Sequence, residues 1–64
     1  MADMFPISET EIPLRDQIEC VKREIGMREQ VYPRRVADGK MKQTTADAEL
    51  ARMRAVLKTL EGLK

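Results

Sequence analysis

Histidine is missing from this chain of 64 residues, and cysteine occurs only once, as Cys20. A single cysteine cannot form a disulfide within the chain, and without histidine beside it a structural zinc site is not expected. The side chain that most often acts as a base near neutral pH is absent, and the sequence has no glycine-rich phosphate loop. We therefore expect a protein that is not an enzyme, with no catalytic residues, cofactor, metal or small-molecule substrate.

Long hydrophobic runs are also missing. No stretch approaches the roughly 20 apolar residues that a membrane-spanning helix needs. The amino terminus lacks a basic segment followed by an apolar block, so we expect neither a secretory signal nor a membrane partner. A lone free cysteine suits a reducing compartment, and the expected location is the cytoplasm.

The chain is short for a protein without disulfides. A domain of 64 residues buries only about 60% of its unfolded surface, so its stability is marginal unless something adds to it. With disulfides and metals set aside, association is the remaining source of stability. We expect a homo-oligomer, a dimer, or a chain that docks on a partner protein.

Two apolar stripes at helical spacing are the clearest positive signal. The first comprises Leu14, Ile18, Val21, Ile25 and Tyr32, and the second comprises Ala46, Leu50, Met53, Leu57 and Leu60. Such steps of three, four and seven residues are typical of the seam between packed helices. The stripes lie on either side of a short glycine-containing break. The sequence therefore predicts an all-α, antiparallel two-helix hairpin, with helices over residues 13–37 and 43–61.

Cap residues indicate where these helices begin and end. Pro13 suits the first position of helix 13–37, because its missing N–H would be unpaired there. Gly39 and Gly62 stand where helix C-terminal caps favour glycine. Thr44, with Asp47 three residues later, resembles a capping box at the start of helix 43–61.

Pro33 and the amino-terminal segment leave alternatives open. A proline inside a helix removes one backbone hydrogen bond and crowds the preceding turn, so Pro33 either kinks the first helix or ends it. We favour the kink, because Val36 and Ala37 continue the apolar face. Residues 1–12 have no helical period and form an arm, either packed on the hairpin or disordered.

Arg28 falls on the first stripe and interrupts it. In one interpretation its aliphatic stem packs in the seam while the guanidinium reaches Glu24, Glu49 or water. In the other, Arg28 sets the helix register or meets a carboxylate across an oligomer interface.

Hydrophobic residues beside the stripes widen the apolar surface beyond what two helices need. Met27 and Val31 flank the first stripe, and Val56 and Leu63 flank the second. A wide apolar face implies more than one neighbouring helix, which favours a dimer forming a four-helix bundle or a partner that fills a groove. The candidate protein-interface residues are Ile25, Met27, Val31, Met53 and Val56.

The net charge of +1 is unevenly distributed. Residues 1–21 hold five acidic side chains and one basic one, whereas residues 22–42 hold seven basic and three acidic ones. Bases near a helix C-terminus are ordinary complements of its dipole. Arginines grouped with an aromatic residue can also contact phosphate and stack on a base. An alternative function is therefore a small dimeric RNA- or DNA-binding regulator, using Arg28, Tyr32, Arg34, Arg35, Lys40 and Lys42.

The segment 17–25 (QIECVKREI), the run 31–34 (VYPR) and the turn 39–41 (GKM) resemble small helical-hairpin proteins encoded by phages and prophages. The similarity covers about residues 13–61. Family members often have serine or threonine in place of Lys42 and tryptophan in place of Arg35; the first departure weakens the second helix cap and the second makes the turn more basic. The resemblance implies a setting rather than an activity: a non-catalytic phage accessory protein that binds proteins or modulates a host factor.

Overall fold

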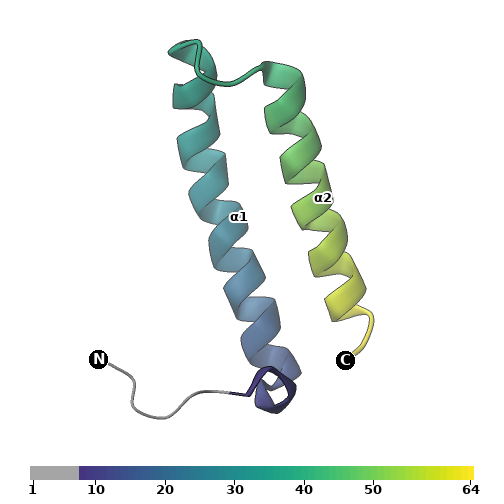
Figure 1. Cartoon of the computed structure of the whole chain (residues 1–64). Helices are drawn as coiled ribbons and strands as arrows, with labels where there is room; N and C mark the ends of the chain where they lie inside the picture. Colours follow the sequence, from purple (N-terminus) through teal and green to yellow (C-terminus); the bar gives the residue numbers. More distant parts are fainter. Residues whose placement is uncertain (1–7) are drawn as a thin grey trace, which may run out of the picture.

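A computed structural model of the chain describes residues 8–64. Within that range the structure is helical, with a 3-10 helix η1 (Glu9–Glu11) followed by α1 (Leu14–Ala37) and α2 (Gln43–Glu61). The two long helices lie side by side, run in opposite directions and are joined by a short turn (Figure 1). The predicted all-α antiparallel hairpin is confirmed. Residues 1–7 of the predicted arm lie outside the described part.

The hairpin is a single layer of helices. It consists of α1 and α2 packed side by side, with no further helix or strand stacked on them in the described range (Figure 1). The buried residues are Ile18, Ile25 and Ala46, all from the predicted stripes. The other stripe residues, Leu14, Val21, Tyr32, Leu50, Met53, Leu57 and Leu60, are half-buried. The periodicity thus predicted correctly which residues pack inward. Two helices alone, however, bury few of these side chains completely.

A side chain in the first turn of α1 connects the start of this helix to the preceding segment. Pro13 is the N-cap, with extended backbone angles, so α1 begins one residue later than predicted. The Gln17 side chain donates a hydrogen bond from Nε2 to the carbonyl of Ile12, at 3.0 Å. This bond and the capping proline connect α1 to η1.

α1 continues through Pro33 and ends at Ala37. The interpretation in which Pro33 ends the helix is therefore wrong. A proline at this position removes the hydrogen bond to the carbonyl four residues earlier. Because only four residues of α1 follow it, the remaining turn is held mainly by its C-terminal cap.

That cap is a Schellman motif built around Gly39. Gly39 has φ +73°, in the left-handed region that glycine adopts without steric cost. Its N–H donates to the carbonyl of Val36 at 3.0 Å, and the N–H of Lys40 donates to the carbonyl of Arg35 at 2.9 Å. The predicted glycine cap is confirmed, and it reverses the chain towards α2.

α2 has the predicted bounds, but its N-cap differs from the predicted one. Lys42 is its N-cap and no side chain caps the helix, so the predicted capping box at Thr44 is wrong. Thr44 already lies inside the helix, and Asp47 instead accepts a hydrogen bond from Gln43 Nε2 at 2.9 Å. Gly62 is the C-cap, as predicted, with right-handed backbone angles.

Candidate protein-interaction surface

Two ion pairs join α1 to α2 on one side of the hairpin. Lys22 Nζ lies 4.0 Å from Glu61 Oε2, and Arg54 Nη2 lies 2.6 Å from Glu29 Oε2. The paired residues are spaced by seven positions on both helices, so the two bridges stand on the same side, one above the other. We call this side the ion-paired flank.

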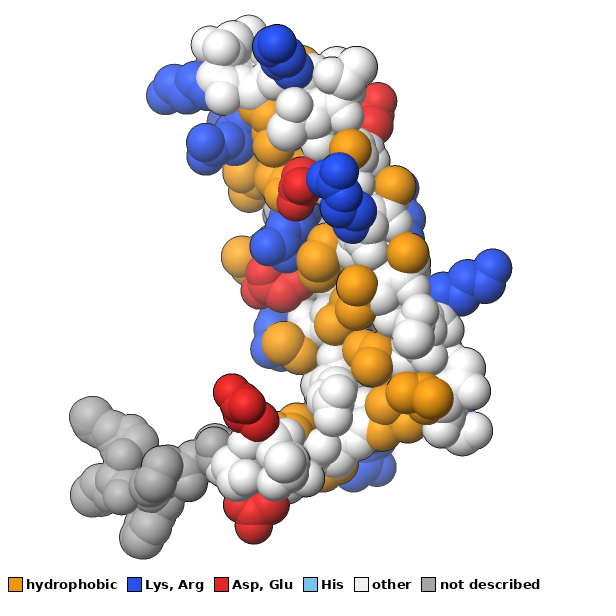
Figure 2. All heavy atoms as spheres, turned by 45° about the vertical axis from the view of Figure 1, so that its right-hand side comes forward, with side chains coloured by type: hydrophobic (Ala, Val, Ile, Leu, Met, Phe, Trp, Pro, Cys, Tyr) orange, Lys and Arg blue, Asp and Glu red, His pale blue; other side chains and the backbone are white. Residues whose placement is uncertain are grey.

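The opposite side of the hairpin carries exposed hydrophobic side chains. At about 100° per residue, Lys22 and Glu29 lie to one side of Ile25 on α1 and Val31 lies to the other. The same count on α2 places Val56 across the buried stripe from Arg54. The large hydrophobic residues exposed in the part of the chain that the structure describes are Met27 (53%), Val31 (45%), Val56 (47%) and Leu63 (66%). We call the surface that they form the apolar flank; hydrophobic side chains run in a line along α2 in Figure 2.

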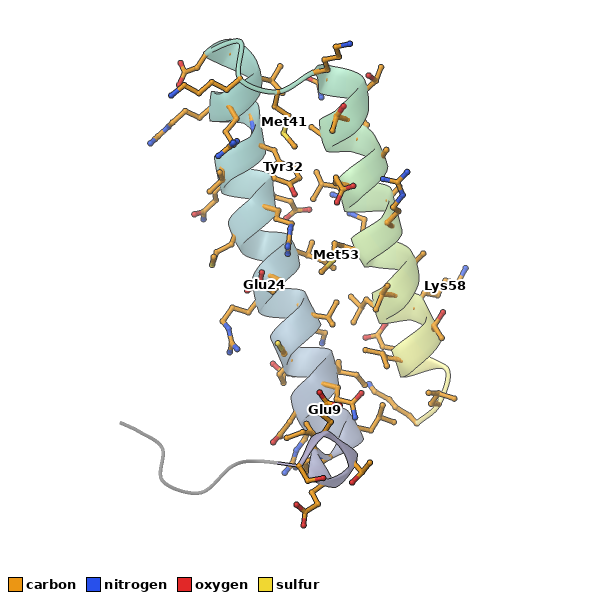
Figure 3. The ribbon with its side chains drawn as sticks, viewed as in Figure 1. Glu9, Glu24, Tyr32, Met41, Met53 and Lys58 are labelled. Atoms are coloured by element: carbon orange, nitrogen blue, oxygen red, sulfur yellow. The ribbon has the colours of Figure 1, made fainter. Side chains whose placement is uncertain are left out.

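A shallow groove of about 260 Å³ lies on the α1 side of this flank, lined by Glu24, Met27, Arg28, Val31 and Tyr32. Arg28 donates from Nη1 to Glu24 Oε1 at 2.9 Å and from Nε to the Tyr32 hydroxyl at 3.2 Å. The hydrogen bond with Tyr32, more than the charge of Glu24, raises the pKa of Arg28 above its usual value. Glu24 and Tyr32, which stand one helical turn before and after Arg28, are labelled on α1 in Figure 3.

Arg28 therefore follows the first of its two interpretations. Its side chain is 32% exposed, and its guanidinium is bound to Glu24 one helical turn earlier. The mixture of a packed stem and a solvent-reaching charge is usual for arginine at the edge of an apolar seam. A role for Arg28 across an oligomer interface stays a prediction.

The structure separates the five predicted interface residues into two groups. Met27, Val31 and Val56 are exposed on the apolar flank, whereas Met53 is half-buried and Ile25 is 8% exposed between the helices. Ile25 is a core residue with almost no surface left for a partner. Periodicity alone could not make this distinction, because a stripe position is equally apolar whether its own hairpin or a partner covers it.

Leu63 is the most exposed large hydrophobic residue in the described part of the chain, but it is not among the five predicted interface residues. Leu63 lies beyond the end of α2 and is 66% exposed, more than any predicted interface residue. Its spacing of seven from Val56 places both on one side of the helical path. That spacing was the only sequence signal that could have added Leu63 to the set.

The turn end gathers part of the predicted nucleic-acid set. Arg34, Arg35 and Lys40 line an open hollow of about 340 Å³ together with Gln30, Val31 and Asp38. These three bases are exposed and form no ion pair within residues 8–64. Lys42 is exposed at the N-cap of α2.

The other two predicted nucleic-acid residues, Arg28 and Tyr32, form a hydrogen bond with each other within α1. Tyr32 is half-buried and its hydroxyl accepts a hydrogen bond from Arg28. Arg28 in turn is paired with Glu24. The hollow at the turn therefore carries exposed positive charge, and Tyr32 is not among the residues that line it.

Residues 8–64 contain no group of three or more Cys, Asp or Glu side chains arranged to hold a metal ion. Neither α1 nor α2 combines the length and the apolar composition that a bilayer-crossing helix requires. The chain matches no protein-family model, no curated protein and no solved structure. The chemistry of the two flanks and of the turn is accordingly the basis for inferring function.

Proposed function

We propose that this protein is a non-catalytic protein-interaction module whose binding surface is the apolar flank. The observation that carries the proposal is the exposure of Met27, Val31, Val56 and Leu63 on one side of a single-layer hairpin. Stable domains normally bury their apolar faces between at least two layers of secondary structure. Complete burial of a side chain of this kind is favourable by about 1.5–3 kcal/mol, so a protein that covers the flank would be bound and would stabilise the hairpin.

The resemblance of the sequence to small phage and prophage proteins supplies a setting for this module. In that setting the protein acts in the bacterial cytoplasm, as an accessory protein that serves the phage programme or occupies a surface of a host factor. Partner binding through the apolar flank requires no catalytic group, and it leaves the ion-paired flank towards solvent.

Two glutamate substitutions test the surface. Val31→Glu and Val56→Glu each place a charge on the apolar flank. Gln30→Glu and Ala55→Glu are matched controls, because they introduce the same side chain at adjacent exposed positions, about 100° away round each helix. Each purified protein is measured for its mass in solution by light scattering and is used as bait in a bacterial lysate.

We expect the wild type and both controls to bind protein, either a second copy or a lysate component, and the two flank variants to lose that binding. A folded wild type that is monomeric and captures nothing would overturn the proposal. Flank variants that bind as well as the wild type would also overturn it.

The alternative function, binding of RNA or DNA, rests on a different observation. Arg34, Arg35 and Lys40 surround one open hollow and are not neutralised by ion pairs within the described range. Phosphate contacts of this kind release counterions, so affinity falls steeply as salt is added. Anisotropy titrations of labelled RNA and DNA from low to high salt test it, with Arg34→Ala and Arg35→Ala as variants. Absent or salt-insensitive binding would exclude it.

A further inference from the structure

We propose that a second copy of this chain covers the apolar flank, and that the two copies run antiparallel, with the turn of one over the open end of the other. The inference rests on the proposed function, because it takes the apolar flank as the binding surface and names what occupies it. The open end is the end of the hairpin opposite the turn, where η1 and the last residues of the chain lie (Figure 1).

The composition of the flank fits a copy of itself. A two-fold interface brings the same patch of each subunit together, so the patch must be self-complementary. The flank combines exposed Val31 and Val56 with two ion pairs that are closed within single helices, Glu24–Arg28 at 2.9 Å and Glu49–Arg52 at 2.8 Å. Two such flanks can meet with their apolar side chains in contact and these carboxylates already paired.

The extent of the flank also fits. Leu63 lies at the open end, Val56 and Met27 lie nearer the middle, and Val31 lies towards the turn, so the exposed hydrophobic residues span most of the length of the hairpin. A second hairpin of the same length would cover all of them at once. It would also provide the second layer that the buried set of Ile18, Ile25 and Ala46 lacks.

Orientation follows from the charges that the hairpin leaves unpaired. The ion pairs among residues 8–64 join residues within 22–29 and 49–61, so none includes a residue of 8–21, 34–47 or 62–64. At the turn, over residues 34–47, the charged side chains are Arg34, Arg35, Asp38, Lys40, Lys42 and Asp47. At the open end, over residues 8–21 and 62–64, they are Glu9, Glu11, Arg15, Asp16, Glu19 and Lys64.

These side chains leave an excess of two positive charges at the turn and of two negative charges at the open end. A helix of 24 residues is about 36 Å long, several times the Debye length of about 8 Å at physiological salt, so each end responds to what lies next to it. Parallel copies would place like charges together at both ends, whereas antiparallel copies place opposite charges together at both. Charges of this kind choose the orientation of an interface more than its affinity.

The first part of the experiment asks whether a second copy is bound. Light scattering of the wild type, Val31→Glu, Val56→Glu and the controls Gln30→Glu and Ala55→Glu should give a dimer for the wild type and controls and a monomer for the flank variants. Thermal unfolding of the wild type at several protein concentrations adds a measurement that does not depend on whether a variant folds, because the Tm of a dimer rises with concentration. A wild-type monomer with a concentration-independent Tm overturns the inference.

The second part asks for the orientation by exchanging charges. Arg34→Glu with Arg35→Glu reverses the turn, and Glu9→Lys with Glu11→Lys reverses the open end; Glu9 is labelled there in Figure 3. In an antiparallel dimer each reversal alone creates like-charge contacts and should raise the dimer Kd roughly tenfold at low salt, while all four changes in one chain should restore it. At about 1 M salt the differences should disappear.

The two parts separate the failure of this inference from the failure of the proposed function. A monomeric wild type that captures a lysate protein through Val31 and Val56 overturns the second copy and leaves the proposed interaction module standing. A monomer that captures nothing overturns both. A dimer whose Kd is unchanged by either charge reversal, as parallel copies would give, overturns the antiparallel arrangement.

Discussion

Glu29 and Arg54 stand 25 positions apart in the sequence, and Arg54 Nη2 donates a hydrogen bond to Glu29 Oε2 at 2.6 Å. Their ion pair joins α1 to α2 on the side of the hairpin opposite the exposed Val31 and Val56. The two flanks of the hairpin consequently differ in polarity. Charged side chains bridge the helices on one flank, and hydrophobic side chains remain uncovered on the other.

The Glu29–Arg54 pair should contribute little to stability despite its short distance. Both side chains are about half exposed (48% and 56%), and exposed ion pairs typically couple by about 0.2–1 kcal/mol. We expect a double-mutant cycle of Glu29→Gln and Arg54→Gln, measured by urea unfolding at one protein concentration, to give a coupling energy in that range. The coupling should vanish at about 1 M salt; one that persists there would contradict this assignment.

Replacing Arg28 with methionine should leave the free energy of unfolding nearly unchanged. Its pair with Glu24 spans one helical turn and is partly exposed, so solvent screens it and it should contribute little to stability. Methionine keeps an unbranched apolar stem in the seam. The matched variant is Glu24→Gln, which breaks the same pair without altering the stripe. A large loss of stability for Arg28→Met, with none for Glu24→Gln, would instead support a role of the guanidinium in setting register.

Ile25→Ala should strongly lower the free energy of unfolding of the hairpin. Truncation of a buried isoleucine to alanine typically costs about 2–5 kcal/mol. Ile25 is one of the three buried residues in the part of the chain that the structure describes, so little other packing compensates for it. We expect most of the helical circular-dichroism signal to be lost at room temperature, whereas Gln30→Ala, at an exposed position of the same helix, should retain it. Retention of full helicity and Tm by Ile25→Ala would show that the core lies elsewhere.

Gly39→Ala and Gly26→Ala should have effects of opposite sign. A Cβ at either position meets no atom within 4 Å, so only backbone preference distinguishes them. Gly39 has φ +73°, where alanine is less favourable by about 1–2 kcal/mol. Gly26 lies inside α1, where alanine is more favourable by about 0.8–1 kcal/mol. Thermal unfolding at a fixed protein concentration should show a lower Tm for the first and a higher Tm for the second. Two shifts of the same sign would contradict the cap geometry.

Several elements of the fold could be predicted because their causes are local. Stripe spacing depends only on the 3.6-residue turn of the helix, so it located Ile18, Ile25 and Ala46 in the interior. The left-handed cap at Gly39 follows from the absence of a Cβ. Where two local signals competed, the sequence was less reliable: Thr44 resembles an N-cap, yet α2 already begins at Gln43.

The candidate surface could be predicted only in outline. The sequence indicated that Met27, Val31 and Val56 widen the apolar stripes, and all three are exposed. It could not distinguish Ile25, which the hairpin itself buries, from residues left for a partner. Nor could it show that Tyr32 binds Arg28 rather than standing free beside the basic turn.

The sequence by itself determined the two helices, their inward stripes and the glycine at the turn, because these depend on the spacing and backbone freedom of neighbouring residues. Only the tertiary structure decided which flank became polar and which stayed apolar. That outcome depends on how α1 and α2 are rotated about their axes when they pack, since the rotation brings Glu29 to Arg54 and Lys22 to Glu61. With both bridges on one flank, Val31 and Val56 are left together on the other.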